Sequence, residues 1–379
     1  MPDAYLDHAA TTPMRPEAVA AVSEVNAVAF GNPSGAHRWA RAARRLLDDA
    51  RDVVAEAVGA RPSEVVFTSG GTEADNLAIR GVAGATGLRP LCTAVEHHAV
   101  IRPVEASGGA LVAVAPDGTV DLDALRAELA NGPAGVVSVM LANNETGTLN
   151  DLAVVAETIA ETSPGTVLHT DAVAAAAWLD LPARCAPASL VTVSGHKVGG
   201  PKGIGALVVR DGTPFEATLL GGGQEHERRS GTQNVAGAVG FAAALRATVS
   251  EREATVARVE TMRQRLVRAA REAVPGLVVV SPDEPDRRTA GTVLFGVPGV
   301  AREALVFMLD RAGVGASWGS SCASGATEPS HVLAAVGIDR AVAEGALRIS
   351  LGWCSTDAEV DHFIAVLPGV IADLRREVA

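Results

Sequence analysis

The stretch Ser189-Leu190-Val191-Thr192-Val193-Ser194-Gly195-His196-Lys197 decides the fold, because a β-branched apolar run of strand length ends on a polar tetrapeptide. It predicts a buried strand with Lys197 at its carboxyl end, and the glycines between 199 and 205 let a bulky ligand approach the backbone. Burial lowers the pKa of an amine, so Lys197 is a candidate to attack an aldehyde near neutral pH. A lone lysine at a strand end more often extends to water, so the neighbouring motifs must decide between these interpretations.

A second β-branched run, Val167-Leu168-His169-Thr170, ends on Asp171. In an open α/β sheet, ligands bind beyond the carboxyl ends of the strands, so Asp171 and Lys197 are predicted to meet in one crevice. The pair suits pyridoxal phosphate (PLP), because the amine can bind its aldehyde as a Schiff base and the carboxylate can keep its ring nitrogen protonated. Asp171 taken alone is equally consistent with a helix N-cap.

A third motif, from Val65 to Ile79, is typical of a strand, a turn at Gly70-Gly71 and an amphipathic helix. The unpaired amides and the dipole at the start of such a helix favour a phosphate group. The pattern is neither Gly-x-Gly-x-x-Gly nor a P-loop, which makes a nucleotide site the weaker interpretation. A Gly-Gly turn by itself is usually only a turn, so its significance comes from the two strand ends described above.

Nine motifs, taken in order, make the chain similar to a known family. It resembles the cysteine desulfurases of the class V aminotransferase group, which are PLP enzymes of fold type I, and it looks most like the branch that supplies sulfur for iron–sulfur clusters. The motifs span nearly the whole chain and are Tyr5 to Pro13, Gly31 to Ser34, Thr68 to Asn76, Glu96 to Val100, Asn143 to Gly147, Ser194 to Lys197, Arg229 to Thr232, Gly319 to Cys322 and Arg348 to Gly352.

The resemblance implies a role for each matching residue at the cofactor. Lys197 would carry PLP, and Asp171 would pair with its pyridine nitrogen. His97 would lie over the ring and move protons, although the adjacent His98 shows that a histidine pair does not by itself identify the working member. The residues that would hold the phosphate are Gly71, Thr72, Ser194 and His196, with Thr232 reaching in from the second subunit of a homodimer.

The resemblance also implies a place for the substrate carboxylate. Asn144, which would contact the cofactor as well, and Arg348 would bind it, and a guanidinium fork suits a carboxylate geometrically. Arg348 lies in an apolar strand from Ala346 to Leu351, where an arginine is costly unless it is paired. That setting favours a ligand over a solvated face.

Cys322 separates desulfuration from other PLP chemistry. It lies among small residues and glycines between positions 316 and 326, which predicts a loop able to move. The resemblance implies that its thiolate takes the sulfur of L-cysteine as a persulfide, leaves L-alanine, and passes the sulfur to an acceptor protein. Cys92, Cys185 and Cys354 are expected to be inert, and the absence of Cys-x-x-Cys and His-x-x-x-His spacings argues against a metal site.

One position departs from the family pattern. Three residues after the aspartate the family usually has a glutamine, which donates a hydrogen bond to the phenolic oxygen of the cofactor, and this chain has Ala174. Loss of a donor to an ionised oxygen is expected to shift the proton equilibrium of the Lys197–cofactor linkage by about one pKa unit. We expect altered tuning and not loss of the cofactor, because the lysine, the aspartate and the phosphate motif remain.

Two other functions stay open on the sequence. The nearer one is another PLP enzyme of the same fold, a selenocysteine lyase or a small-molecule aminotransferase, which a substrate profile would separate. The farther one is a non-catalytic sulfur carrier or scaffold, marked by Ala174, which would show no visible cofactor band. The acceptor is also open among an iron–sulfur scaffold, tRNA thiolation enzymes and a DNA phosphorothioation system.

Composition limits the setting in which the protein works. A length of 379 residues with 48% apolar content predicts two domains, and 3% aromatic residues require an aliphatic core. A formal charge of −12 argues against direct nucleic-acid binding. Neither a signal peptide nor an apolar run of membrane-spanning length is apparent, and four cysteines without paired spacing indicate a reducing compartment, so we expect a cytoplasmic protein with no membrane contact.

Strands and helices alternate over the first two hundred residues, which predicts an α/β fold with a mostly parallel sheet covered by helices. A long helical stretch, Val235 to Val274, with a break expected near Val249-Ser250, leads to a smaller α+β domain. The predicted large, PLP-binding domain is 14–255, and the small domain comprises 1–13 and 256–379. The predicted strands are Val65 to Thr68, Leu91 to Val95, Leu111 to Val114, Val136 to Ala142, Val167 to Thr170, Leu190 to Val193, Ile204 to Val209, Leu277 to Val280, Thr292 to Phe295 and Leu347 to Leu351.

Overall fold

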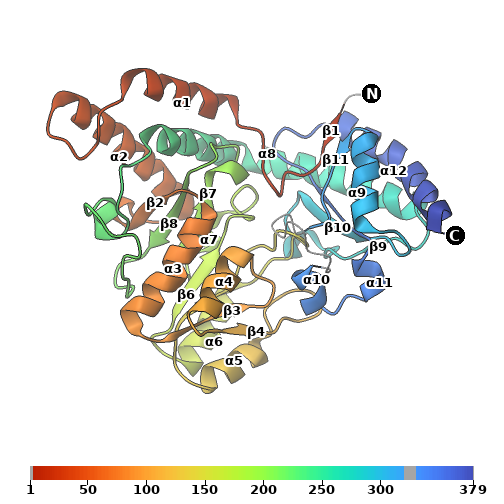
Figure 1. The fold of residues 1–379 in the computed structure, drawn as a ribbon, viewed down its shortest axis with the longest axis horizontal. Helices are drawn as coiled ribbons and strands as arrows, with labels where there is room; N and C mark the ends of the chain where they lie inside the picture. Colours follow the sequence, from red (N-terminus) through yellow and green to blue (C-terminus); the bar gives the residue numbers. More distant parts are fainter. Residues whose placement is uncertain (1–2, 320–329, 379) are drawn as a thin grey trace.

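The structure, a computed structural model, describes residues 3–319 and 330–378 and is centred on a seven-stranded sheet (Figure 1). The strand order is β2-β8-β7-β6-β5-β3-β4, with β8 antiparallel to both neighbours and the other pairs parallel. The predicted mostly parallel α/β sheet is therefore confirmed. Its strands are β2 (Val65–Thr68), β3 (Arg89–Thr93), β4 (Ala110–Val112), β5 (Ala134–Ser138), β6 (Val167–Asp171), β7 (Leu190–Ser194) and β8 (Gly205–Val209).

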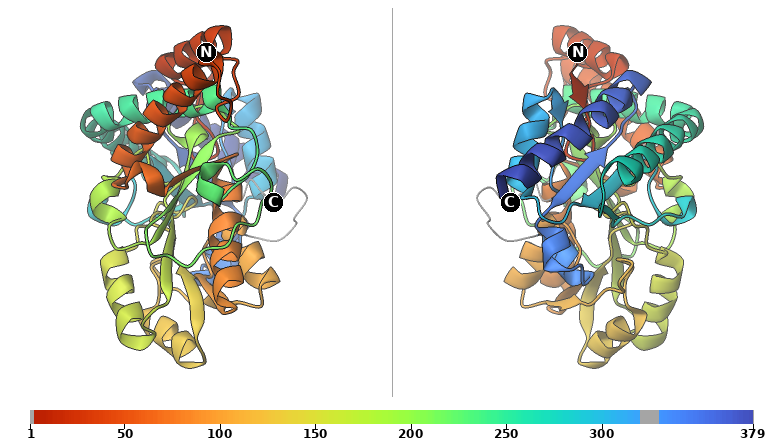
Figure 2. Two further views of the ribbon diagram at one scale, coloured as in Figure 1. Left: turned by 90° about the vertical axis from the view of Figure 1, so that its left-hand side faces the viewer. Right: turned by 90° about the vertical axis from the view of Figure 1, so that its right-hand side faces the viewer.

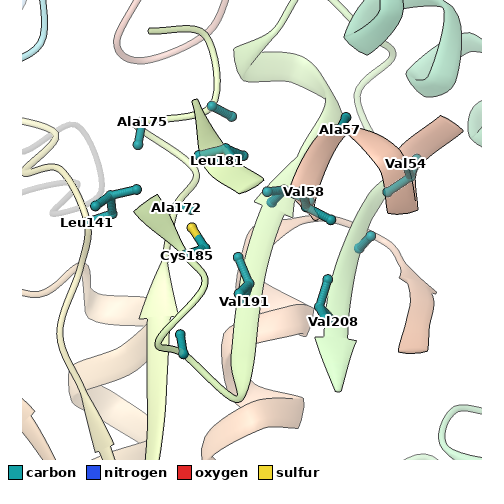
Figure 3. Close-up of a cluster of buried hydrophobic side chains, with 14 of the residues drawn as sticks. Val54, Ala57, Val58, Leu141, Ala172, Ala175, Leu181, Cys185, Val191 and Val208 are labelled. Atoms are coloured by element: carbon teal, nitrogen blue, oxygen red, sulfur yellow. The ribbon is translucent and has the colours of Figure 1, made fainter. Parts of the chain in front are cut away.

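Helices cover both faces of this sheet, because successive side chains of each strand point to opposite sides. On β7, Val191 packs into the cluster under α2 (Arg38–Val58), whereas Leu190 packs into the cluster under α3 (Gly71–Thr86). Figure 3 shows the first cluster, with Val191 and Val208 of the sheet beneath Val54 and Val58 of α2. The other helices around the sheet are α1 (Pro16–Val28), α4 (His98–Ala106), α5 (Leu122–Ala130), α6 (Leu152–Thr162) and α7 (Leu181–Arg184).

A second, smaller body is built around an antiparallel sheet in the order β12-β10-β9, with a separate parallel pair of β1 and β11 (Figure 2). Ala4 and Leu6, near the N-terminus, are buried in the same cluster as Phe295 and Phe363. Among the described residues, no helix is long and apolar enough to cross a membrane. The elements are β1 (Ala4–Tyr5), β9 (Val278–Val279), β10 (Thr292–Gly296), β11 (Val314–Gly315), β12 (Ala346–Ser350), α9 (Arg302–Arg311), α10 (His331–Ala335), α11 (Arg340–Ala343) and α12 (Asp357–Val378).

One continuous helix, α8 (Val235–Ala273), joins the two bodies, so the expected break near Val249-Ser250 is wrong. Its first half packs Leu245 into the core beside the large sheet, and its second half packs Val259 into the core of the smaller body. Between them the helix leaves both cores, and Val249 is exposed. The apolar periodicity lapses there because the helix spans a gap between two cores. The predicted boundary at 255 falls in this exposed part and stays a prediction.

A buried ion pair fastens the 224–227 segment to the edge of the large sheet. Arg51 of α2 donates to both carboxylate oxygens of Glu225, at 2.7 and 2.8 Å, and also to the carbonyl of Val65. The amide of Phe67 donates to Glu225 Oε2 at 2.8 Å. Burial opposes ionisation of Glu225, but the hydrogen bonds from Arg51 outweigh it and hold its pKa below the usual value.

We expect Glu225→Gln to lower the free energy of unfolding by about 3 kcal/mol, because it leaves the Arg51 guanidinium buried without a countercharge. Urea denaturation at neutral pH measures the change. Glu227→Gln is the matched control, since Glu227 is exposed two residues away and its replacement should cost less than ~0.5 kcal/mol. Equal midpoints for the two variants would show that the pair contributes nothing.

Candidate active site

The three motifs predicted to converge do so in one pocket of about 240 Å³, at the carboxyl ends of β6 and β7 and the N-terminus of α3. Nine of the residues predicted for the site line it together. They are Gly71, Thr72, His97, Asn144, Asp171, Ser194, His196, Lys197 and Arg348.

Lys197 ends a short 3₁₀ turn, Gly195–Lys197, that follows β7 directly. Its Nζ donates to the carbonyl of Ala10 at 2.9 Å and to the carbonyl of Ala9. Thr12 fixes the same N-terminal segment, since its amide and hydroxyl both donate to the carbonyl of His196, at 3.1 and 2.9 Å. The amine is therefore held in place by backbone from the opposite end of the sequence.

Asp171 is the last residue of β6 and is buried. Its Oδ1 accepts a hydrogen bond from the amide of Val173 at 2.8 Å. Burial raises the pKa of Asp171 to about 6, while the Val173 amide and the charge of Lys197 oppose the rise. The side chain is thus ionised at neutral pH and can accept a hydrogen bond from a cationic ring nitrogen in the pocket.

A layer of buried polar groups lies next to Asp171 and was not predicted from the sequence. His169 Nδ1 lies 2.8 Å from Ser138 Oγ, and its Nε2 lies 3.0 Å from Thr192 Oγ1 and 3.7 Å from Asp75 Oδ1. Burial lowers the pKa of His169 to about 3, so the ring is neutral. Burial and the charge of Asp171 raise the pKa of Asp75, which favours its uncharged form and leaves the local negative charge on Asp171.

The end of the pocket nearest α3 has the features of a phosphate site. Gly70, at a φ of 151° that favours glycine, turns the chain into the helix, so the amides of the first turn, from Gly71 and Thr72, are not used within the helix. Ser194 Oγ is buried and has no hydrogen-bond partner among the described residues. A phosphate acceptor would satisfy both the hydroxyl and the amides. His196 Nδ1 lies 3.2 Å from Thr11 Oγ1, and burial lowers its pKa to about 4.

His97 caps the N-terminus of α4 through its Nδ1, which accepts from the amide of Ala99 at 3.1 Å. Burial, followed by the charge of Lys197, lowers the pKa of His97 to about 4. The ring is neutral at pH 7, and its proton lies on Nε2 because Nδ1 accepts from Ala99. His98 also lines the pocket, but its ring packs on His331 with centroids 4.6 Å apart. The structure thus gives the two adjacent histidines different partners.

Arg348 is almost fully buried in β12 and finds its countercharge within the chain. Its NH2 donates to Asp7 Oδ1 at 2.8 Å, and its NH1 donates to the carbonyls of Asn144 and Gly319, both at 3.0 Å. An arginine in this apolar strand was expected to be paired, and its ionic partner is Asp7. The Nε of Arg348 has no partner among the described residues, so part of the guanidinium remains for a substrate carboxylate.

Of the two remaining predicted site residues, one lies elsewhere in the structure and the other falls outside its described part. Thr232 is exposed in the segment before α8 and does not line it, so its role from a second subunit stays a prediction. Cys322 lies outside the described residues. Burial raises the pKa of Cys92, Cys185 and Cys354, which disfavours their thiolates.

Glu145 was missed as well. It lines the pocket, is buried, and accepts a hydrogen bond from Ser330 Oγ at 2.7 Å. It lies next to Asn144 in the Asn-Asn-Glu motif, which was the only signal for it. In the part of the chain that the structure describes, no group of three or more histidine, cysteine, aspartate or glutamate side chains is placed to hold a metal ion.

Comparison with known proteins gives one consistent family. The model of the class-V aminotransferases matches residues 4–363. An IscS-like cysteine desulfurase of Mycobacterium tuberculosis is 42% identical over 386 residues, which cover 98% of this chain and 97% of that protein. Among solved structures, a NifS-like protein is similar with a TM-score of 0.89 at 30% identity, covering 98% of this chain and all (100%) of that one. SspA in complex with cysteine is similar with a TM-score of 0.79 at 28% identity, covering 93% of this chain and 100% of that one.

Proposed function

This chain belongs to the class-V aminotransferase family, and from that membership and the pocket described above we propose that it is a PLP-dependent cysteine desulfurase that converts L-cysteine to L-alanine and supplies the sulfur to an acceptor. The observation that carries the proposal is the convergence of Lys197 and Asp171 in one buried pocket, beside a buried Ser194 hydroxyl without a partner. A lysine, an acid and a phosphate cradle are the groups that PLP needs.

The residues present fit PLP in three places. Lys197 Nζ would hold the aldehyde carbon, Asp171 would face the ring nitrogen, and Ser194 with the first turn of α3 would hold the phosphate. When bound, PLP supplies an electron sink for the electron pair left at the substrate's α-carbon. Side chains of this protein would carry out the remaining tasks, which are substrate binding, proton transfer and sulfur transfer.

Substrate binding falls to Arg348 and Asn144. The unpartnered Nε–H of Arg348 would donate to the carboxylate of L-cysteine, while Asp7 holds the arginine in place through NH2. Burial strengthens this contact, because the pair is screened little by water. SspA, a relative, is known in complex with cysteine, which supports a cysteine-sized substrate here.

Proton transfer falls to Lys197 and His97. Lys197 Nζ would remove the proton from the α-carbon of the substrate once the amine has left the carbonyls of Ala9 and Ala10. His97 is uncharged at pH 7 and its Nδ1 accepts from the Ala99 amide, so its proton lies on Nε2, from which it could be donated to the product.

Sulfur transfer falls to Cys322. Its thiolate would attack the sulfur of L-cysteine, so that an S–S bond forms while the C–S bond breaks. The electron pair of the C–S bond stays with the carbon that becomes the methyl carbon of alanine. Cys322 is then a persulfide, and the sulfur passes to an acceptor. The protein is proposed to work in the cytoplasm as a homodimer in which Thr232 completes the neighbouring phosphate site.

The test is mass spectrometry of the protein after incubation with L-cysteine. We expect one added sulfur atom on the peptide that contains Cys322, together with release of alanine, and neither in Cys322→Ala. Cys354→Ala is the matched control and should gain sulfur like the parent. Sulfur on Cys92 or Cys354, or alanine release by Cys322→Ala at the parent rate, would contradict the assignment.

A further inference from the structure

A second, smaller recess adjoins the cofactor pocket, and Ala174 stands between the two. Its volume is about 40 Å³. Ala9, Asn144, Val173, Ala174 and Lys197 line both spaces. The two cavities therefore share a wall at the lysine, to which residue 174 contributes only a methyl group.

The lining of the recess is mostly apolar but includes several polar groups on its far side. Thr292 of β10, Trp178 and Thr255 of α8 line it but do not line the cofactor pocket. The side chains of Asn144, Trp178 and Thr292 make no hydrogen bond to any described residue. They offer an indole N–H, a hydroxyl and a carboxamide, which together provide both donors and acceptors.

The volume decides what such a space can hold. A single buried water needs on the order of 10–15 Å³ by the same measure and two to four polar partners. A recess of about 40 Å³ therefore has room for a small group of waters and not for the side chain of a larger amino acid. The polar lining supplies the partners.

We propose that this recess is a binding site for ordered water, and that its water, reaching the pocket past Ala174, donates to the phenolic oxygen of the bound cofactor the hydrogen bond that an alanine cannot donate. The inference rests on the proposed function, because it needs PLP at Lys197. The phenolic oxygen of PLP is carried by the ring atom next to the one that bears the aldehyde. With the ring nitrogen at Asp171, the aldehyde carbon at Lys197 and the phosphate at Ser194, this oxygen would lie on the side of the ring away from the phosphate, toward the wall that Ala174 and Asn144 share.

A hydrogen bond to an ionised oxygen stabilises its negative charge and makes the neighbouring proton easier to release. The experiment is a pH titration of the visible absorption band of the resting holoenzyme, without substrate. The variants are Ala174→Leu, which fills the opening without a donor, Ala174→Gln, which fills it with one, and Thr292→Val, which removes one partner of the water at nearly constant volume.

We expect Ala174→Leu to raise the pH of the colour change by about one unit, Thr292→Val to raise it by less, and Ala174→Gln to leave it near the parent value. A crystal structure of the holoenzyme should show water between Thr292 and Trp178. Should Ala174→Leu fail to fold, Thr292→Val alone still tests the proposal.

The proposal is overturned if the parent titrates like Ala174→Leu while Ala174→Gln titrates about one unit lower, since the parent would then lack a donor. It is also overturned if Thr292→Val titrates like the parent or if the recess is dry. These outcomes differ from failure of the proposed function, in which the parent has no visible band at all; that result would overturn both.

Discussion

Replacing Lys197 by alanine is expected to abolish desulfuration, with a fall in the rate of alanine formation of at least ~10³-fold. The expectation follows from the two roles proposed for one nitrogen, because Lys197 Nζ would both hold the cofactor and remove the α-proton of the substrate. No other lysine can take its place, since Lys202 is the only other one in the chain and is exposed. The visible band that borohydride fixes should vanish as well.

Because the chain has only two lysines, Lys202 provides the control for Lys197. Lys202→Ala should keep the parent rate and the borohydride-fixed band, and peptide mapping of the parent should place the reduced cofactor on the peptide that contains Lys197. A band retained in Lys197→Ala and fixed at Lys202 would contradict the assignment. Circular dichroism should show that the Lys197→Ala protein is folded, because the two hydrophobic cores are untouched by the substitution.

Replacing Asp171 by asparagine is expected to weaken cofactor binding about 10- to 100-fold, which is the loss of one charge-assisted hydrogen bond. At saturating cofactor, the desulfuration rate should fall by ~10²-fold or more, because the electron sink is no longer held protonated. The backbone should hardly change, since an amide oxygen can still accept from the Val173 amide. Fluorescence titration of the apoenzyme with PLP measures the affinity.

The pH dependence of PLP affinity shows whether the charge of Asp171, and not only its size and shape, contributes to cofactor binding. With a pKa of about 6, Asp171 loses its charge as the pH falls, so the affinity of the parent apoenzyme for PLP should be high at pH 7 and above and fall as the pH is lowered through 6. The Asp171→Asn protein should lack this dependence, and Asp180→Asn, at an exposed position, should behave like the parent. A parent affinity that stays flat between pH 7 and 5 would refute the charge argument.

The main site could be predicted because its residues stand at the tips of strands. β6 and β7 are both β-branched runs, and the carboxyl ends of parallel strands meet at one edge, so Asp171 and Lys197 could be brought together by topology alone. The helix at Gly71 followed from the turn that precedes it. These inferences need only local patterns and the rules of sheet topology.

The buried polar residues next to Asp171 could have been predicted from the sequence but were not. Asp75 lies one helical turn after Gly71, and His169 lies two residues before Asp171, so each shares a face with a predicted site residue. Side-chain periodicity therefore held the signal. The pairing of Asp7 with Arg348, across 341 positions of sequence, had no such signal, because nothing local relates the two.

Helix boundaries were the other weak point. The long helix α8 appeared to break because its middle part touches neither core, and periodicity reports burial and not hydrogen bonding. α1 (Pro16–Val28) was not predicted at all, since only Ala18 and Val25 are buried on it and its apolar stripe is thin. Tertiary packing against α8 stabilises it, and a single sequence does not show that contact.

The link between the first residues and Arg348 has a consequence for biosynthesis. A ribosome delivers Asp7 and the carbonyls of Ala9 and Ala10 minutes or seconds before the strand that carries Arg348, so the large sheet can form on the nascent chain while its catalytic crevice is still open on one side. The arginine proposed to bind the substrate can therefore pair with Asp7 only after nearly all of the polypeptide has emerged, so the substrate side of the crevice is completed later than the side proposed for the cofactor.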